Sequence, residues 1–462
     1  MKIRRIMIAA PKSGSGKTTV TCGLLQICKN YEEKVSACKC GPDYIDPMFH
    51  EKILDVPSKN LDTFFTGEEK TKELLLQGRE ENELVVMEGV MGLYDGLGGI
   101  REEGSSYHLA KVTNTPIVLI VDAKGMGRSI LAVIAGFLAY DTAHLIGGIV
   151  LNRISKSYYT MLKPLIEEEL PVKVMGYVPV EKEWEISSRH LGLVMPEEIP
   201  DMQKKMQKMA EKLEETVAVS EILKLADEAI DLIVEKSAGE MEKIEYGEED
   251  FPVIAVAKDE AFCFYYEDNL NLLKKCGAKL RYFSPLHDKT IPKECDGVLL
   301  GGGYPELYAK ALSENDTMRN SVKQAFEKQM PLVAECGGFL YLQESVSDRE
   351  GRTYPMAGVF HSRAYDAEKL VRFGYIEISE KESTFLPAGE YIRGHEFHYY
   401  DSTDNGTDCT ALKPVTKKRY DCMKEGKDYF CGFPHLYYPS NPKFAEIFVQ
   451  KAAAYRKRRN GL

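Results

Sequence analysis

The sequence predicts an α/β protein with two domains, each built around a mainly parallel sheet. The chain has 462 residues, which is more than one hydrophobic core usually organises. Short apolar runs alternate with helical patterns in both halves, as expected when helices cover a parallel sheet. An acidic, polar segment separates the two series. Together these observations predict two α/β domains joined by a linker.

The first domain, residues 1–236, contains six apolar runs that predict buried strands. Polar or glycine-containing sequence follows each run, and open α/β sheets bind ligands beyond the carboxyl ends of their strands. The amphipathic stretch from Ile199 to Lys236 predicts a long helical segment at the end of this domain. The predicted strands are Ile6–Ala10, Val35–Cys38, Leu84–Met87, Ile117–Val121, Ile146–Leu151 and Val172–Val178.

The second domain is predicted at residues 251–445, after a linker at 237–250 that is nearly free of apolar residues. Residues 446–462 are predicted to form a C-terminal helix or tail, in which the basic run Arg456–Arg459 is the solvated end of a helix. The predicted strands are Val253–Ala257, Lys279–Phe283, Gly297–Leu300, Leu332–Ala334, Gly374–Ile378 and Tyr429–Phe433.

The composition, 44% hydrophobic and 28% charged, is that of an ordinary globular protein. No apolar run is long and uncharged enough to span a bilayer, so no membrane association is expected. The formal net charge of -11 opposes sequence-independent binding to nucleic acid. Eleven irregularly spaced cysteines predict reduced thiols in the cytoplasm rather than a disulfide framework. A small-molecule partner is therefore expected.

A phosphate-binding loop follows the first predicted strand and leads into an apolar helix. The glycines let backbone N–H groups surround a phosphate, Lys17 can reach the terminal phosphates of ATP, and Thr18 can bind magnesium. Proline replaces the usual first glycine at Pro11. Lys12 stands where dimer-type loops carry an extra lysine, which resembles the nucleotide site of dethiobiotin synthetase. The predicted ATP-binding residues are Lys12, Gly14, Ser15, Gly16, Lys17, Thr18 and Thr19.

Acidic residues after two other strands are candidates for holding the magnesium of an ATP site. One group is Asp43 and Asp46, after the second strand, and the other is Glu88 with the loop that follows it. A lone aspartate in such a place is more often a helix cap or turn residue. Three acids near one phosphate loop favour the functional reading, with Thr18, Asp43 and Glu88 as predicted metal ligands.

The second domain carries a candidate thiol site. Cys336 follows an apolar strand and precedes two glycines and a helix, a pattern typical of a nucleophile elbow in which the helix start favours the thiolate. Gly302 and Gly303 follow another strand and can supply N–H groups to an oxyanion. His435, about a hundred residues after the cysteine, is the candidate proton carrier. Taken singly, this cysteine or histidine would more often be structural.

The motifs together resemble the cobyrinic acid a,c-diamide synthase family over essentially the whole chain. This resemblance implies an N-terminal P-loop domain like dethiobiotin synthetase, with a parallel sheet, and a C-terminal class I glutamine amidotransferase α/β domain. The matching segments are Gly41–Asp46, Asn60–Asp62, Glu88–Gly96, Arg189–Leu193, Asp259–Phe262, Phe264–Tyr266, Phe283–Asp288, Leu300–Glu306, Phe373–Tyr375 and Arg393–Tyr399.

The resemblance implies a ligase that uses Mg²⁺, ATP and L-glutamine to amidate the c and a carboxylates of cobyrinic acid through acyl phosphates, on the anaerobic route to cobalamin. It implies that Cys336 attacks glutamine and that His435 transfers the proton. The dimer-type loop also allows a homodimer. The residues implied around the acyl phosphate and the substrate are Asp43, Tyr44, Ile45, Asp46 and Asp95.

Three positions depart from the family pattern. Tyr437 stands where many class I amidotransferases have an acid, Pro434 precedes the histidine, and Ile45 replaces a more usual leucine. Close rivals share the chemistry: the substrate could be hydrogenobyrinic acid or nickel sirohydrochlorin, while cobyric acid synthase matches the motifs less well. A rival of another class is a dimeric P-loop ATPase switch with a non-catalytic glutamine-sensing domain.

Overall fold

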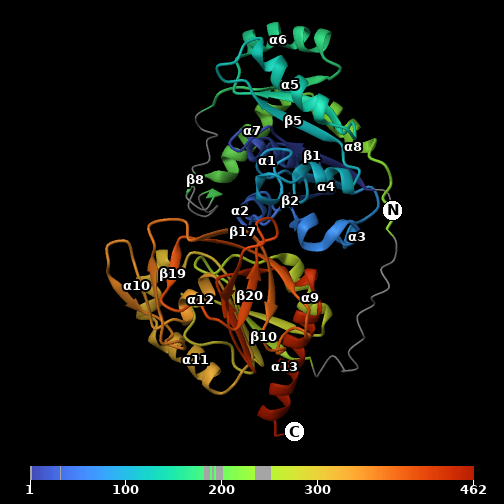
Figure 1. Cartoon of the computed structure of the whole chain (residues 1–462). Helices are drawn as coiled ribbons and strands as arrows, with labels where there is room; N and C mark the ends of the chain where they lie inside the picture. The colour runs from blue at the N-terminus through green and yellow to red at the C-terminus, as the bar shows by residue number, and fades with distance from the viewer. Residues whose placement is uncertain are drawn as a thin grey trace. The chain divides into compact units, whose positions relative to one another are not determined.

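The computed structural model describes residues 3–31, 33–181, 188–189, 192–193, 201–234 and 251–461. The chain forms two compact units, Met1–Gly239 and Glu240–Leu462 (Figure 1). The predicted linker at 237–250 lies outside the described residues. Within the described part, no helix is long and apolar enough to cross a membrane.

The first unit is built on a seven-stranded sheet in the order β3-β2-β4-β1-β5-β6-β7, in which every neighbouring pair is parallel. All six predicted strands are present, although β7 begins two residues later than predicted. One strand, β3, was not predicted. The strands are β1 Arg4–Ala9, β2 Val35–Cys40, β3 Ser58–Leu61, β4 Leu84–Glu88, β5 Ile117–Asp122, β6 Ile146–Asn152 and β7 Val174–Val178, and a separate short pair is β8 Ser188–Arg189 with β9 Gly192–Leu193.

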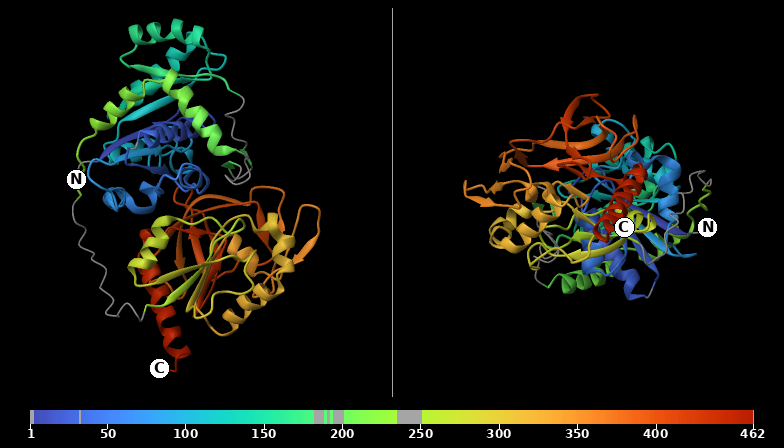
Figure 2. Two further views of the ribbon diagram at one scale, coloured as in Figure 1. Left: turned by 180° about the vertical axis from the view of Figure 1, so that it is seen from behind. Right: turned by 90° about the horizontal axis from the view of Figure 1, so that it is seen from below.

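Helices of the first unit connect the parallel strands, and α1 packs on β1, β2 and β4. The helices are α1 Lys17–Asn30, α2 Ile45–Met48, the π-helix η1 Phe49–Ile53, α3 Thr63–Leu76, the 3-10 turn η2 Leu97–Gly99, α4 Ser106–Val112, α5 Ser129–Tyr140, α6 Lys156–Glu169, α7 Met202–Thr216 and α8 Val219–Asp227 (Figure 2).

The helical stretch predicted from Ile199 to Lys236 is two helices, α7 and α8, rather than one. Between them Val217 bridges Gly176 of β7, and the N–H of Ala218 donates to a carbonyl of the same strand at 2.7 Å. Gly176 allows this approach, because a Cβ there would lie 2.5 Å from the backbone of Val217. The chain therefore leaves the helix to bond to the edge of the sheet.

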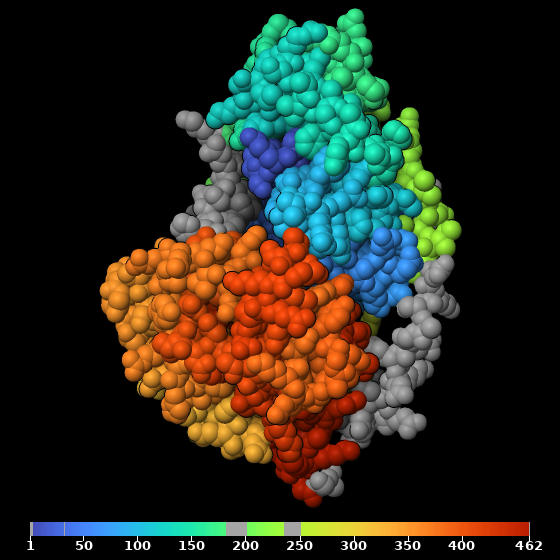
Figure 3. Space-filling model, viewed as in Figure 1, coloured from blue at the N-terminus to red at the C-terminus, as the bar shows by residue number. Residues whose placement is uncertain are grey.

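The second unit combines a mainly parallel sheet with antiparallel ones. The central sheet has the order β11-β10-β12-β13-β23-β22, and only β22 is antiparallel to its neighbour. A five-stranded antiparallel sheet, β21-β20-β17-β18-β24, and a four-stranded sheet, β15-β14-β16-β19, complete the unit. The orange and red segments that carry these antiparallel strands form much of the visible face of this unit in Figure 3.

The elements of the second unit include all six of its predicted strands. Two apolar clusters, one on each side of the central sheet, form its core. The strands are β10 Val253–Ala257, β11 Lys279–Phe283, β12 Gly297–Leu300, β13 Leu332–Glu335, β14 Ser345–Ser347, β15 Thr353–Pro355, β16 Arg363–Asp366, β17 Arg372–Glu380, β18 Ile392–His398, β19 Tyr400–Ser402, β20 Cys409–Leu412, β21 Arg419–Cys422, β22 Lys424–Gly426, β23 Tyr429–Gly432 and β24 His435–Leu436. The helices are α9 Glu267–Lys275, η6 Pro305–Tyr308, α10 Ala309–Glu314, α11 Asp316–Glu327, α12 Gly337–Leu342, η7 Tyr438–Ser440 and α13 Lys443–Arg459.

The C-terminal helix α13 belongs to the core of the second unit. Its apolar residues Phe444, Phe448 and Ala452 are fully buried, and it contacts α9 and β12. At its basic end, Arg459 forms an ion pair of 3.2 Å with the buried Asp296. All eleven cysteines are free thiols.

Candidate functional site

The phosphate-binding loop lies between β1 and α1, and residues from the end of β6 support it. Gly14 and Gly16 have φ angles of 71° and 94°, which favour glycine. The amide of Asn152 donates to the carbonyl of Ser15 at 2.7 Å, and a Cβ on Gly16 would lie 2.2 Å from that amide nitrogen. Arg153 donates to the carbonyl of Gly14 at 3.2 Å. This pair of supporting residues was not predicted, because its only sequence signal is its place directly after a predicted strand.

The reactive side chains of the loop contact the segment that follows β4. The ammonium of Lys17 donates to the carbonyl of Met91 at 2.6 Å, and the hydroxyl of Thr18 donates to Glu88 Oε1 at 2.6 Å. Burial, followed by repulsion from Lys39, lowers the pKa of Lys17 to about 8. Lys12 is exposed, Ser15 is buried and Thr19 is half-buried. Four of the predicted ATP-binding residues, Gly14, Gly16, Lys17 and Thr18, thus form one loop and helix start.

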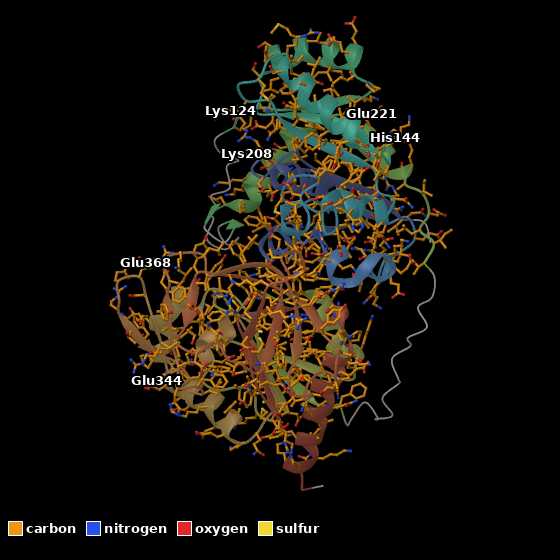
Figure 4. The ribbon with its side chains drawn as sticks, in the orientation of Figure 1. Lys124, His144, Lys208, Glu221, Glu344 and Glu368 are labelled. Atoms are coloured by element: carbon orange, nitrogen blue, oxygen red, sulfur yellow. The ribbon has the colours of Figure 1, made fainter. Side chains whose placement is uncertain are left out.

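A buried group of charges lies beside Thr18. Glu88 ends β4, and its Oε1 accepts from Lys39 Nζ at 3.0 Å, while the same ammonium is 2.5 Å from Asp46. The second carboxylate oxygen of Glu88 lies 3.3 Å from Nε2 of His50. These four side chains are buried, unlike surface charges such as Lys124 and Glu344 (Figure 4).

Electrostatics within this group set the ionisation of its members. Burial opposes the charge of Glu88, but Lys39 and the contacts with His50 and Thr18 outweigh it and lower the pKa of Glu88. Burial also opposes the charge of Lys39, and the two carboxylates beside it raise its pKa. Burial and the neighbouring acids raise the pKa of Asp46. Lys39 and His50 are thus the partners of the buried acids, and neither was predicted to have a role.

The other predicted acids lie at the edge of this group. Oδ1 of Asp43 accepts the N–H groups of Ile45 and Asp46 at 2.9 and 3.2 Å, at the start of α2. Asp95 is exposed and accepts the N–H of Gly92 at 3.0 Å. Tyr44 is half-buried and Ile45 is buried.

Magnesium fits the pair formed by Thr18 and Glu88. No three His, Cys, Asp or Glu side chains in the described ranges form a complete metal site. Mg²⁺ does not need one, because it normally binds one or two protein oxygens together with phosphate oxygens and water. A hydroxyl and a carboxylate oxygen 2.6 Å apart beside a phosphate loop meet that requirement.

In the second unit, Cys336 occupies a strained turn between β13 and α12. Its φ and ψ are 47° and -104°, a conformation that non-glycine residues seldom adopt. The two following glycines have no room for a side chain: a Cβ on Gly338 would lie 2.2 Å from the carbonyl oxygen of Leu300, and one on Gly337 would lie 2.8 Å from Pro305. This geometry matches the predicted nucleophile elbow.

The N–H of Gly337 at the helix start favours the thiolate of Cys336, as expected, but burial opposes it and has the larger effect on the pKa. Cys336 is only 8% exposed, and burial, followed by the charge of Glu306, raises the pKa of its thiol. The carboxyl groups of Glu335 and Glu396 act in the same direction. Helix α12 has only six residues, so its dipole is small beside these effects.

The loop after β12 lies against both the elbow and His435. The amide nitrogen of Gly303 is 3.1 Å from the point where a Cβ on Gly337 would lie. A Cβ on Gly302 would lie 2.4 Å from Cε1 of His435. The structure thus brings Gly302 and Gly303, the predicted oxyanion donors, next to the elbow and to the predicted proton carrier.

His435 is buried among aromatic rings. Burial, followed by the nearby His398, lowers the pKa of His435 to about 3. The ring of His395 stacks on it at 5.0 Å between centroids, and Nδ1 of His395 lies 3.1 Å from the hydroxyl of Tyr266. Tyr437, at the position of the usual acid, donates instead to Asp268 at 2.8 Å. His395 belongs to a segment that sequence reasoning recognised without giving it a role.

Two family models match this chain, one within each of its two units. Residues 6–194 match the CobQ/CobB/MinD/ParA nucleotide binding domain, and residues 253–441 match the CobB/CobQ-like glutamine amidotransferase domain. The cobyrinate a,c-diamide synthase of Caldanaerobacter subterraneus subsp. tengcongensis is 37% identical over 98% of this chain and 100% of that protein. The chain belongs to the cobyrinate a,c-diamide synthase family. Proteins of the same name from Clostridium acetobutylicum and Thermoplasma volcanium are 40% and 35% identical over 93% and 99% of this chain, and 94% and 99% of their own lengths.

Membership of the cobyrinate a,c-diamide synthase family confirms the predicted resemblance and the predicted pair of folds. It also confirms the enzyme class: the chain is a glutamine-dependent, amide-forming ligase of cobalamin biosynthesis with a nucleotide-binding domain that supports the use of ATP. The ATPase switch with a non-catalytic glutamine-sensing domain is therefore not the favoured reading. The roles of individual residues stay predictions.

Proposed function

We propose that this ligase amidates the c and a carboxylates of cobyrinic acid, one after the other, on the anaerobic route to cobalamin in the cytoplasm. The observation that carries the proposal is that each unit holds one half of the chemistry. A phosphate loop with Thr18 bonded to Glu88 stands in the first unit, and a cysteine elbow beside a loop that touches His435 stands in the second. The names of the full-length relatives support the choice of substrate.

The glutamine half of the reaction uses the second unit. The sulfur of Cys336 attacks the carboxamide carbon of glutamine as its proton passes to His435, and the N–H groups of Gly302 and Gly303 hold the developing oxyanion. His435 then gives the proton to the departing nitrogen, which leaves as ammonia. Water hydrolyses the thioester, which releases glutamate and restores the thiol. Burial lowers the pKa of His435 to about 3, so the imidazole is neutral near pH 7, the form that accepts a proton, although the same shift makes it a weaker base.

The synthetase half uses the first unit. The carboxylate of the macrocycle attacks the terminal phosphoryl group of ATP, ADP leaves, and ammonia then displaces phosphate from the acyl phosphate to form the amide. Lys12 and Lys17 would bind the phosphates, and Thr18, Asp43 and Glu88 would hold Mg²⁺, which neutralises phosphate charge when bound. The residues proposed around the acyl phosphate and substrate are Asp43, Tyr44, Ile45, Asp46 and Asp95.

The first test is product formation by the purified enzyme with Mg²⁺, ATP, glutamine and cobyrinic acid, with phosphate and glutamate measured in parallel. The wild type should form the a,c-diamide and release one phosphate and one glutamate for each amide. A Cys336→Ala variant should form it only from added ammonia. If cobyrinic acid stays unchanged while hydrogenobyrinic acid or nickel sirohydrochlorin is amidated, the substrate assignment is wrong.

The proposed homodimer needs a separate measurement. Light scattering with and without Mg²⁺ and ATP should give twice the mass of the chain when nucleotide is bound, if Lys12 acts as in dimer-type loops. A monomer under both conditions would remove this part of the proposal.

A further inference from the structure

A line of buried polar atoms runs from β3 to the phosphate loop. Ser58 Oγ lies 3.0 Å from His50 Nδ1, and His50 Nε2 lies 3.3 Å from Glu88 Oε2. The other oxygen of Glu88 accepts from the hydroxyl of Thr18 at 2.6 Å. His50 and Glu88 are both completely buried. His50 thus contacts the far side of the carboxylate that Thr18 contacts on the near side.

The backbone that carries His50 is unusual. His50 lies in the π-helix Phe49–Ile53, in which the N–H of Leu54 donates to the carbonyl of Phe49 at 3.3 Å, across five residues. Such segments are rare and occur often at functional sites. The wider turn continues directly from α2, which carries Asp46, so it places His50 on the same acid group.

Chemistry fixes the direction of each contact in this line. An ionised carboxylate only accepts hydrogen bonds, so the imidazole must present its Nε2–H to Glu88. The hydroxyl of Ser58 can then donate to Nδ1, which holds the ring in that tautomer. Glu88 Oε1 already accepts from Thr18 and Lys39. Neither His50 Nε2 nor Glu88 Oε2 has a hydrogen bond of standard geometry to any described residue, so each depends on the other.

We propose that His50 is a positioning residue, which fixes the carboxylate of Glu88 so that Thr18 and Glu88 present their oxygens together to the magnesium of the bound nucleotide. The inference rests on the proposed role of Glu88 in the synthetase half of the reaction. Partners of this kind are worth about 10–100-fold in metal affinity or activity. Ser58 acts one step further away, because it holds only the ring.

Two variants separate positioning from packing. His50→Gln puts an amide N–H near the place of Nε2 and keeps the contact with Glu88. His50→Asn puts its amide near the place of Nδ1 and keeps only the contact with Ser58. Glu51→Gln changes an exposed neighbour in the same π-helix and is the control. Circular dichroism and thermal melting establish that each variant is folded.

The first readout is the binding of a fluorescent, non-hydrolysable ATP analogue as Mg²⁺ is titrated, and the second is ammonia-dependent amidation. His50→Asn should raise the Mg²⁺ concentration for half-maximal binding about 10–100-fold. His50→Gln should stay within about threefold of the wild type, and Glu51→Gln should match it. The rate of amidation should follow the same order, because the substitutions should raise the apparent KM for Mg²⁺.

Equal behaviour of the Gln and Asn variants would overturn the proposal, whether both bind normally or both fail. If His50→Asn is unfolded, Ser58→Ala decides: a rise in the Mg²⁺ requirement of less than about tenfold supports the line of contacts, and no rise overturns it. Nucleotide binding does not need the macrocycle. A wild type that binds the analogue but ignores cobyrinic acid would therefore refute the proposed substrate, and His50 would still be tested.

Discussion

Replacing Gly302 with alanine should disable the use of glutamine and spare the use of ammonia. Gly302 does not have a positive φ, so alanine can adopt its backbone conformation. The new Cβ would lie 2.4 Å from Cε1 of His435, whereas non-bonded carbons normally lie about 3.5–4.0 Å apart. The Gly302 carbonyl accepts the N–H groups of Cys263 and Phe264, each at 3.0 Å, which holds the backbone in place. The imidazole must therefore retreat by about 1 Å.

A displacement of about 1 Å in a catalytic group costs roughly 100-fold in rate, which corresponds to about 2.7 kcal/mol of activation free energy. The assay is amide formation with glutamine and, separately, with ammonium chloride at saturating ATP. Gly297→Ala is the matched control in β12, because a Cβ there meets its nearest atoms at 3.5 Å, an ordinary contact. The control should keep both activities, while Gly302→Ala should lose about 100-fold with glutamine only.

A Gly302→Ala enzyme that uses glutamine within about threefold of the wild-type rate would refute this prediction. In that case the position of His435 would not limit the glutamine reaction. An equal loss with glutamine and ammonia would also refute it, because the change would then have damaged more than the thiol site. Glutamate release without macrocycle gives a direct measure of the glutamine step alone.

Three further substitutions test other parts of the two units. Lys39→Met leaves the buried carboxylates of Asp46 and Glu88 without their cation, so the free energy of unfolding in urea should fall by about 3–5 kcal/mol. A fall of less than about 1 kcal/mol would contradict a stabilising role of these ion pairs. Burial raises the pKa of Glu335 from 4.5 to about 8, so the folded protein keeps a proton that the unfolded chain loses. Between pH 5 and 8 the free energy of unfolding should therefore fall by up to about 1.4 kcal/mol per pH unit relative to that of Glu335→Gln. If the difference between the two proteins, measured by urea unfolding, is the same at pH 5.5 and at pH 7.5, this prediction is wrong. Asn152→Asp replaces the donor to the carbonyl of Ser15 with an acceptor, so affinity for a fluorescent ATP analogue should drop by about tenfold or more, and unchanged affinity would remove Asn152 from the support of the loop.

The sequence predicts the parallel strands well because their apolar runs are local. The same logic misses β3, whose residues are Ser58, Lys59, Asn60 and Leu61. This edge strand has a single apolar residue, and its burial comes from tertiary neighbours rather than from its own pattern. The break between α7 and α8 is missed for a similar reason, because only the contact with Gly176 of β7 reveals it.

The residues of the candidate sites also form two groups: those that a local motif predicts and those that only the folded chain brings together. Motif residues such as Lys17, Thr18 and Cys336 can be named from the sequence because each chemical role is tied to a local turn. Lys39 lies in a strand between two cysteines, and its contacts with Asp46 and Glu88 come from other segments of the chain. A pattern of neighbouring residues cannot predict such a contact.

The ionisation of Cys336 shows why local rules are insufficient at a buried site. The start of α12 favours a thiolate, but burial and the acidic groups around the elbow favour the thiol and raise its pKa. His435 is equally unfavourable to charge, since its pKa is lowered to about 3. Both groups are therefore neutral near pH 7, and no thiolate–imidazolium pair is stored in the protein alone. These directions favour proton transfer together with the attack on glutamine, so a displacement of His435 is expected to slow the bond-forming step.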